Sequence, residues 1–155
     1  MHLLKRVSLH MAEIQKLKEE IKVGATDDNG NEEETKKSNF TYKVKDGTAI
    51  ITGYTGQETA IVIPSTIDGY KVTEIGDDAF KTTKITSVSI PSTVTVIGWF
   101  AFTDCISLTA AVIPESVKSI GYEAFSGCKS LTVYAIRDSY AAKYAKSYGI
   151  TVSVE

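Results

Sequence analysis

The chain has 155 residues, of which 43% are apolar and 23% are charged, and its formal net charge is −2. This is the composition of an ordinary globular domain, and the near-neutral charge argues against non-specific binding to nucleic acid or to an anionic membrane surface. No stretch reaches the roughly 18 consecutive apolar residues of a membrane span, so membrane insertion is not expected.

The first segment, residues 1–23, has the pattern of an amphipathic helix. Residues of one helical face recur at intervals of three and four, and all but His10 are apolar: Leu3, Val7, His10, Ile14, Leu17 and Ile21. One interpretation is a short coiled coil or a helix that pairs with a partner helix, including self-association. The other is a helix that packs on its own domain or belongs to a longer protein. Three heptads are marginal alone, so both interpretations stay open.

Residues 24–39 are polar and acidic and are expected to form a flexible linker. An Asp-x-Asn-x-Asn sequence starts at Asp27, as in a calcium-binding loop. Glu32 then occupies the position that needs glycine, and Ser38 occupies the position that needs glutamate. The pattern therefore predicts a solvated linker and no metal site.

An N-terminal hairpin is expected next. Residues 40–44 and 48–52 alternate between apolar and polar side chains, and Asp46-Gly47 lies between them. Asp-Gly between two alternating segments is a strong signal for a tight hairpin turn. We expect this hairpin to cap a repeat array, with a further strand over residues 59–63 leading into the first repeat.

Three related units follow the hairpin. Each unit contains the same three dipeptides, Ile-Pro (63–64, 90–91, 113–114), Ile-Gly (75–76, 97–98, 120–121) and Ala-Phe (79–80, 101–102, 124–125). The last two units keep a strict spacing of 23 residues, and the first carries five extra residues around Asp68–Tyr70 and one fewer before Ile85. A period of 23 falls in the range of leucine-rich repeats.

The repeat also has the strand pattern L-x-x-L-x-L, starting at Ile85, Leu108 and Leu131. Alternate residues of such a strand point into the core and outward. Proline ends the strand, the glycine of Ile-Gly is expected to supply an unusual turn conformation, and Ala-Phe returns an aromatic ring to the core. No single rung can bury its apolar face alone. The prediction is an α+β repeat fold over residues 40–155, a short right-handed leucine-rich-repeat solenoid of about four rungs.

A helical cap is expected at the C-terminal end. Asp138 or Ser139 can cap a short helix, Gly149 fits its end, and residues 150–154 alternate like a last strand. Three tyrosines lie on one face of this helix at helical spacing: Tyr140, Tyr144 and Tyr148. We interpret this stripe mainly as a cover over the last rung. The alternative is a platform on which a ligand stacks.

The complete motif is Ile-Pro-x-Ser/Thr-Val-x-x-Ile-Gly-x-x-Ala-Phe-x-x-Cys-x-x-Leu. It closely resembles the BspA-like leucine-rich repeats of bacterial and some protist surface proteins, over about residues 40–155. The resemblance implies a non-enzymatic binding or adhesion module at the cell surface or in the secreted fraction, with a host or extracellular-matrix protein as partner. Because charged residues interrupt the apolar ones in residues 1–23, no secretory signal is predicted, and the cytoplasm is the alternative location. A structural or oligomerising unit is the alternative function.

Two surfaces are candidates for binding a partner. The outward positions of successive strands form two stripes of small residues: Val62, Ser89, Val112 and Ala135 in one, and Ala60, Ser87, Ala110 and Val133 in the other. Such a flat, weakly apolar face suits a partner, although a small domain can also expose such area without using it. Three aromatic residues at non-motif positions are the second candidate, either as binding anchors or as packing between rungs: Tyr70, Trp99 and Tyr122.

The residues needed for catalysis are not found. Both histidines, His2 and His10, precede residue 40. Ser-His-Asp and Cys-His chemistry is therefore excluded within the repeats, unless the first segment folds back over them. The pairs Asp77-Asp78 and Asp104 with Glu123 fall in outer loops, where solvated charge is the usual role. No catalytic residue, cofactor or metal site is predicted.

Cys105 and Cys128 occupy equivalent places in adjacent rungs. Stacked strands lie about 4.8 Å apart, which is within reach of a disulfide. Both side chains should nevertheless point the same way into an apolar core. We therefore favour two buried free thiols over a disulfide.

Overall fold

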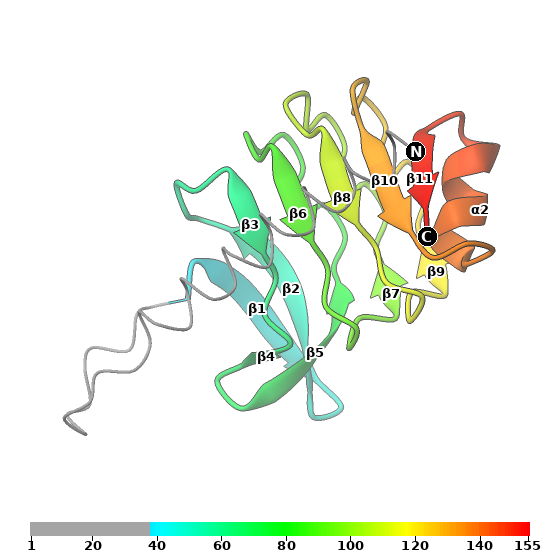
Figure 1. Ribbon diagram of the computed structural model, residues 1–155. Coiled ribbons are helices and arrows are strands. Elements are labelled where there is room, and N and C mark those ends of the chain that lie inside the picture. The colour runs from blue at the N-terminus through cyan, green and yellow to red at the C-terminus, as the bar shows by residue number, and fades with distance from the viewer. Residues whose placement is uncertain (1–37) are drawn as a thin grey trace, which may run out of the picture.

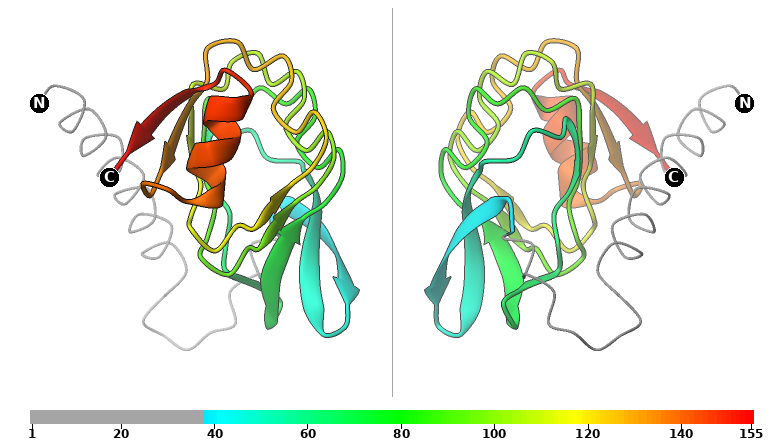
Figure 2. Two further views of the ribbon diagram at one scale, coloured as in Figure 1. Left: turned by 90° about the vertical axis from the view of Figure 1, so that its right-hand side faces the viewer. Right: turned by 90° about the vertical axis from the view of Figure 1, so that its left-hand side faces the viewer.

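The structure is a computed structural model, and it describes residues 38–155. The expected helix over residues 1–23 and nearly all of the expected linker lie outside the described residues. In the described part, no helix is long and apolar enough to cross a membrane. The chain winds into a solenoid of about five turns with one helix at its C-terminal end. Figure 1 shows the turns from the side, and Figure 2 looks along the axis of the solenoid.

Two sheets form the walls of the solenoid. The first, which we call the face sheet, has five parallel strands in the order β11-β10-β8-β6-β3. Its strands are β3 (Ala60–Val62), β6 (Ser87–Ser89), β8 (Ala110–Val112), β10 (Thr132–Ala135) and β11 (Thr151–Val154). The second sheet has the order β1-β2-β5-β7-β9, and β4 (Thr66–Ile67) also pairs with β5. Its strands are β1 (Phe40–Lys45), β2 (Thr48–Tyr54), β5 (Tyr70–Ile75), β7 (Val96–Ile97) and β9 (Ser119–Ile120).

The expected hairpin forms the N-terminal cap. Strands β1 and β2 pair antiparallel, and β2 pairs in parallel with β5 of the first rung. Asp46 and Gly47 have φ values of 50° and 77°, as a tight two-residue hairpin turn requires. The ring of Phe40 lies 6.3 Å from that of Phe80, so the hairpin also covers the first aromatic ring of the core.

The core is built around a ladder of phenylalanines from the Ala-Phe pairs. The rings of Phe80, Phe102 and Phe125 stack at 5.0 Å from rung to rung, with interplanar angles of 3° and 1°. All three are almost completely buried. Tyr144 of the helix continues the ladder, with its ring 6.3 Å from Phe125. The repeat spacing therefore translates directly into stacking of equivalent side chains, as the sequence predicted.

The glycines of the Ile-Gly pairs have a different role from the expected one. Neither Gly98 nor Gly121 has a positive φ; the left-handed residues are Phe100 and Glu123, two positions later. A Cβ on Gly98 would lie 2.6 Å from the backbone nitrogen of Asp77, and one on Gly121 would lie equally close to the backbone of the preceding rung. Glycine is needed here because neighbouring rungs approach too closely for any side chain.

The C-terminal cap is the helix α2 (Tyr140–Ser147), which lies across the last rung (Figure 2). Ser139 is its N-cap and accepts a hydrogen bond from the backbone nitrogen of Ala142 at 3.2 Å. Gly149 ends the turn with a φ of 69°. The expected last strand, β11, pairs with β10 and adds a fifth strand to the face sheet. The sequence prediction of about four rungs did not count this strand, because it lacks the repeat motif.

Candidate interaction surfaces

The face sheet brings six of the predicted stripe residues into register. Ala60, Ser87 and Ala110 are paired from strand to strand, and so are Val62, Ser89 and Val112. Ala60, Val62 and Val112 are partly exposed. Ser87, Ser89 and Ala110 are buried, although Ala110 does not belong to the core cluster. Over β3, β6 and β8, the outer side of the face sheet is therefore made of small side chains.

The prediction was wrong for the last strand of the two stripes. Val133 and Ala135 point into the solenoid and belong to the core cluster. Thr132 pairs with Ala110, a separation of 132 − 110 = 22 residues, whereas Ala110 and Ser87 are 110 − 87 = 23 residues apart. A shift of one residue turns every side chain of a strand to the opposite face. The outward residues of β10 are therefore Thr132 and Tyr134.

A hollow lies at one end of the face sheet, beyond the last residues of β8 and β10. It has a volume of about 260 Å³. Its lining is mostly apolar and includes Val112, Pro114, Tyr134 and Ile136, with Ser153 contributed by β11. We call it the face-sheet hollow. Large apolar groups surround this recess, among them Tyr134 and Ile136.

A second surface, which we call the aromatic edge, consists of Trp99, Phe100 and Tyr122. The Trp99 and Tyr122 side chains are 60% and 58% exposed, and their rings meet edge to face at 6.3 Å. The Phe100 ring lies 5.7 Å from that of Tyr122 at an angle of 88°. The two exposed rings directly follow the Ile-Gly pairs of adjacent rungs, so the repeat itself places them side by side.

Backbone contacts fix the aromatic edge. The Trp99 backbone nitrogen donates to the carboxylate of Asp77 at 2.8 Å, and the Phe100 backbone nitrogen donates to the carbonyl of Tyr122 at 3.0 Å. Tyr70, the third predicted aromatic, is also exposed but lies in β5 of the first rung. It is not part of this cluster. All three predicted aromatics are exposed, and the structure brings two of them, Trp99 and Tyr122, together.

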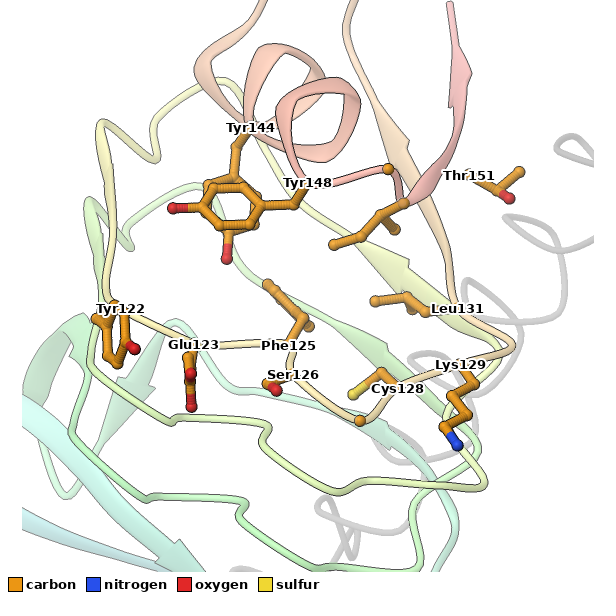
Figure 3. Close-up of a pocket in the computed structure, with 13 residues that line it drawn as sticks. Tyr122, Glu123, Phe125, Ser126, Cys128, Lys129, Leu131, Tyr144, Tyr148 and Thr151 are labelled. Atoms are coloured by element: carbon orange, nitrogen blue, oxygen red, sulfur yellow. The ribbon is translucent and has the colours of Figure 1, made fainter.

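A pocket of about 480 Å³ opens at the C-terminal end of the solenoid (Figure 3). Tyr122 and Glu123 line one side of it, and Tyr144 and Tyr148 of the cap line another. The Tyr148 ring packs on Tyr144 with centroids 4.5 Å apart. Burial is the main cause that raises the pKa of Tyr144 to about 12. Tyr144 thus covers the core, as the sequence mainly predicted, and Tyr148 remains exposed at the edge of the pocket.

Asp77, Asp78 and Glu123 of the outer loops have structural partners. Asp77 accepts the hydrogen bond from Trp99, and Asp78 forms an exposed ion pair with Lys81 at 3.4 Å. A hydrogen bond to Glu123 is the main cause that raises the pKa of Tyr122. These contacts tie each carboxylate to the loop that carries it or to the rung beside it.

The two cysteines are free and buried, as the sequence favoured. The Cys105 thiol donates to the carbonyl of Phe80 at 2.9 Å, and the Cys128 thiol donates to the carbonyl of Phe102 at 3.0 Å. Each thiol thereby satisfies a backbone carbonyl of the preceding rung. The contact with Cys105, together with burial, raises the pKa of Cys128 well above that of a free thiol. Cys128 therefore stays protonated and serves as part of the core.

Comparisons with known proteins agree with this architecture. The profile of the BspA type leucine rich repeat region matches residues 59–148. A leucine rich cell surface protein from Faecalibacterium prausnitzii is 42% identical with a TM-score of 0.58; the match covers 61% of this chain and 28% of that one. A leucine-rich repeat protein from Bacteroides capillosus is 35% identical with a TM-score of 0.61; the match covers 66% and 80% of the two chains. The comparison with curated proteins gives no match. The chain thus spans only a part of the Faecalibacterium protein.

Proposed function

Because the chain belongs to the family of BspA type leucine-rich repeat proteins, we propose that it is a non-enzymatic protein-interaction module of a surface or secreted protein. The related Faecalibacterium protein is described as a cell surface protein, which supports this location. The partner is a host or extracellular-matrix protein. Repeat proteins of this kind present an extended, preformed surface, so binding does not require the ordering of flexible segments.

The partner contacts the aromatic edge. The observation that carries this proposal is the exposure of Trp99 and Tyr122, more than half of each side chain, in a cluster of rings on adjacent rungs. Tryptophan and tyrosine are the side chains most enriched among residues that dominate binding energy. Because both rungs are fixed by the phenylalanine ladder, the two rings are presented without a large entropic cost on binding.

The face sheet contributes less to this contact. Its partly exposed members, Ala60, Val62 and Val112, are small, and small aliphatic residues rarely dominate the energy of an interface. They can extend a contact by shape but do not anchor it. The aromatic edge is therefore the surface to test first.

The test measures binding to a panel of immobilised extracellular-matrix and host-cell surface proteins by surface plasmon resonance. The wild type is compared with the double variant Trp99→Ala/Tyr122→Ala. Ile106→Ala is the matched control, because Ile106 is an exposed apolar residue outside the aromatic edge. We expect a loss of about 30-fold or more in affinity for the double variant, as for anchors worth about 2 kcal/mol or more. Equal binding of the double variant and the control would rule out the aromatic edge.

The second candidate function is a structural or oligomerising unit. The amphipathic pattern of residues 3–21 favours it, because such a stripe can pair with a helix of another chain. Sedimentation of the full chain and of Leu17→Asp tests this directly. If the chain is a dimer that the substitution converts to a monomer, the first segment is an assembly element.

A further inference from the structure

We propose that residues 1–23 dock as an amphipathic helix on the outer side of the face sheet of the same chain. The apolar row Leu3, Val7, Ile14, Leu17 and Ile21 would lie over β6, β8 and β10. This inference concerns a different surface from the aromatic edge. It assigns the face sheet to an internal partner and leaves the aromatic edge free for an external one.

The composition of the face sheet suits a helix. Small outward side chains let a helix approach a sheet closely, and the row of Ala60, Ser87 and Ala110 provides them. Within residues 38–155, no strand or helix lies across this side of the sheet (Figure 1). Ser87, Ser89 and Ala110 are nevertheless buried, which agrees with a covered face.

The face-sheet hollow gives the helix a socket. A flat row of small residues alone would bind an apolar ridge weakly, since it offers little shape complementarity. The hollow adds a recess of about 260 Å³ bounded by Val112, Tyr134 and Ile136. Such a recess accepts a leucine or isoleucine side chain and withdraws it from water, which contributes about 1.5–3 kcal/mol for each side chain that becomes fully buried.

The lengths of the segments also fit. Residues 3–21 would form a helix about 28 Å long at 1.5 Å per residue. Five strands at a spacing of about 4.8 Å make a sheet about 19 Å wide, so the helix can cross all of them. Asn39 lies next to the start of the loop that leads into β3, because its carbonyl accepts a hydrogen bond from the Thr55 backbone nitrogen at 2.8 Å. The 16 residues of the expected linker would span about 22 Å on average as a flexible chain.

Docking within one chain is favoured over pairing between chains. A short linker of the expected kind would keep residues 1–23 near their own face sheet at an effective concentration in the millimolar range. Two chains at micromolar concentration meet far less often. The same apolar row therefore favours an internal contact over the intermolecular helix pair that the sequence also allows.

The experiment uses paramagnetic broadening in the full chain. A nitroxide label is attached to Ala12→Cys, because position 12 falls opposite the apolar row on a helical wheel. The native cysteines, Cys105 and Cys128, are buried. Wild-type protein treated with the same label is the control that shows whether they react. We expect amide signals of β6 and β8 in the ¹⁵N-labelled protein to lose most of their intensity. In a mixture of spin-labelled unenriched chains with unlabelled ¹⁵N chains, we expect no loss. Loss in the mixture would mean pairing between chains, and no loss in either sample would mean no docking. Either result overturns the proposal.

A second variant keeps the test independent of the label position. Ile14→Asp/Leu17→Asp places two charges on the apolar row and should restore the β6 and β8 signals. Glu13→Gln/Glu20→Gln, on the polar side of the same segment, is the matched control and should leave the broadening unchanged. Persistent broadening in the Asp variant would show that the apolar row does not make the contact. The remaining amide spectrum of residues 38–155 reports in every sample whether the solenoid is folded.

Discussion

Replacement of Gly98 by alanine tests how closely the rungs stack. The added Cβ would lie 2.6 Å from the Asp77 nitrogen and 2.7 Å from the Gly76 carbonyl carbon, where ordinary contact begins at 3.4 Å. The shortfall is 3.4 − 2.6 = 0.8 Å, and both atoms belong to the backbone, so no side-chain rotation relieves it. Moving the rungs apart would stretch two hydrogen bonds, from Gly98 to Ile75 at 2.7 Å and from Asp78 to Trp99 at 2.9 Å.

We expect a loss of about 3 kcal/mol in the free energy of unfolding for Gly98→Ala. Overpacking costs about 1–3 kcal/mol, and two weakened hydrogen bonds cost about 0.5–1.5 kcal/mol each. The assay is urea unfolding followed by far-ultraviolet circular dichroism. Gly69→Ala is the control, because its Cβ meets nothing within 4 Å and only its φ of +83° opposes alanine, at about 1–2 kcal/mol. If Gly98→Ala costs no more than Gly69→Ala, the close approach of the rungs does not determine stability.

Three further predictions concern stability. Thr82 has a φ of 61°, and Gly127 occupies the equivalent place two rungs later. Glycine adopts such a backbone without strain, so Thr82→Gly should raise the free energy of unfolding in urea by about 0.5–1 kcal/mol. A lower free energy of unfolding would contradict this. Phe102→Ala removes the middle ring of the ladder and should cost about 4 kcal/mol in the same assay. The pKa of Tyr144 is about 12 in the folded protein against 10 in a free side chain. As the pH rises, Tyr144 therefore loses its proton in the unfolded state before it does so in the folded state. The free energy of unfolding should be highest below pH 10 and fall by about 1–2 kcal/mol as the pH rises to 12. Tyr144→Phe should lose less stability over the same interval, and equal losses would argue against this cause.

The sequence predicted the repeat architecture because its period is carried by large apolar residues. Each Ala-Phe pair places one ring at the same height of its rung, and the structure stacks those rings at 5.0 Å. The hairpin and the helix cap were also predictable, since Asp46-Gly47, Ser139 and Gly149 are local signals that need no tertiary information.

The register of the last repeated strand was not predictable from the motif. Leu131-x-x-Tyr134-x-Ile136 fits the repeat pattern as well as its neighbours do, yet the structure buries Val133 and Ala135 instead. Two alternating sets of apolar residues were available, and the cap decided between them. Val152 and Val154 of β11 pair with the inward residues of β10 and extend the core.

The role of the Ile-Gly glycines depends on a neighbouring rung and is equally invisible in a single repeat. A glycine that recurs in every repeat suggests a left-handed backbone. At Gly98, however, a Cβ would clash with the backbone of the neighbouring rung. The aromatic edge likewise depends on contact between neighbouring rungs. Trp99 and Tyr122 are separated by 23 positions and become neighbours only because the rungs stack.

The most direct test of a solenoid that presents a preformed aromatic edge is a nuclear Overhauser spectrum of the free protein. The ring protons of Phe102 should show cross peaks to both Phe80 and Phe125, and Trp99 should show cross peaks to Tyr122 before any partner is added. Cross peaks of Trp99 to its sequence neighbours alone, or the absence of contacts between the three phenylalanine rings, would contradict the stacked arrangement and the binding surface built on it.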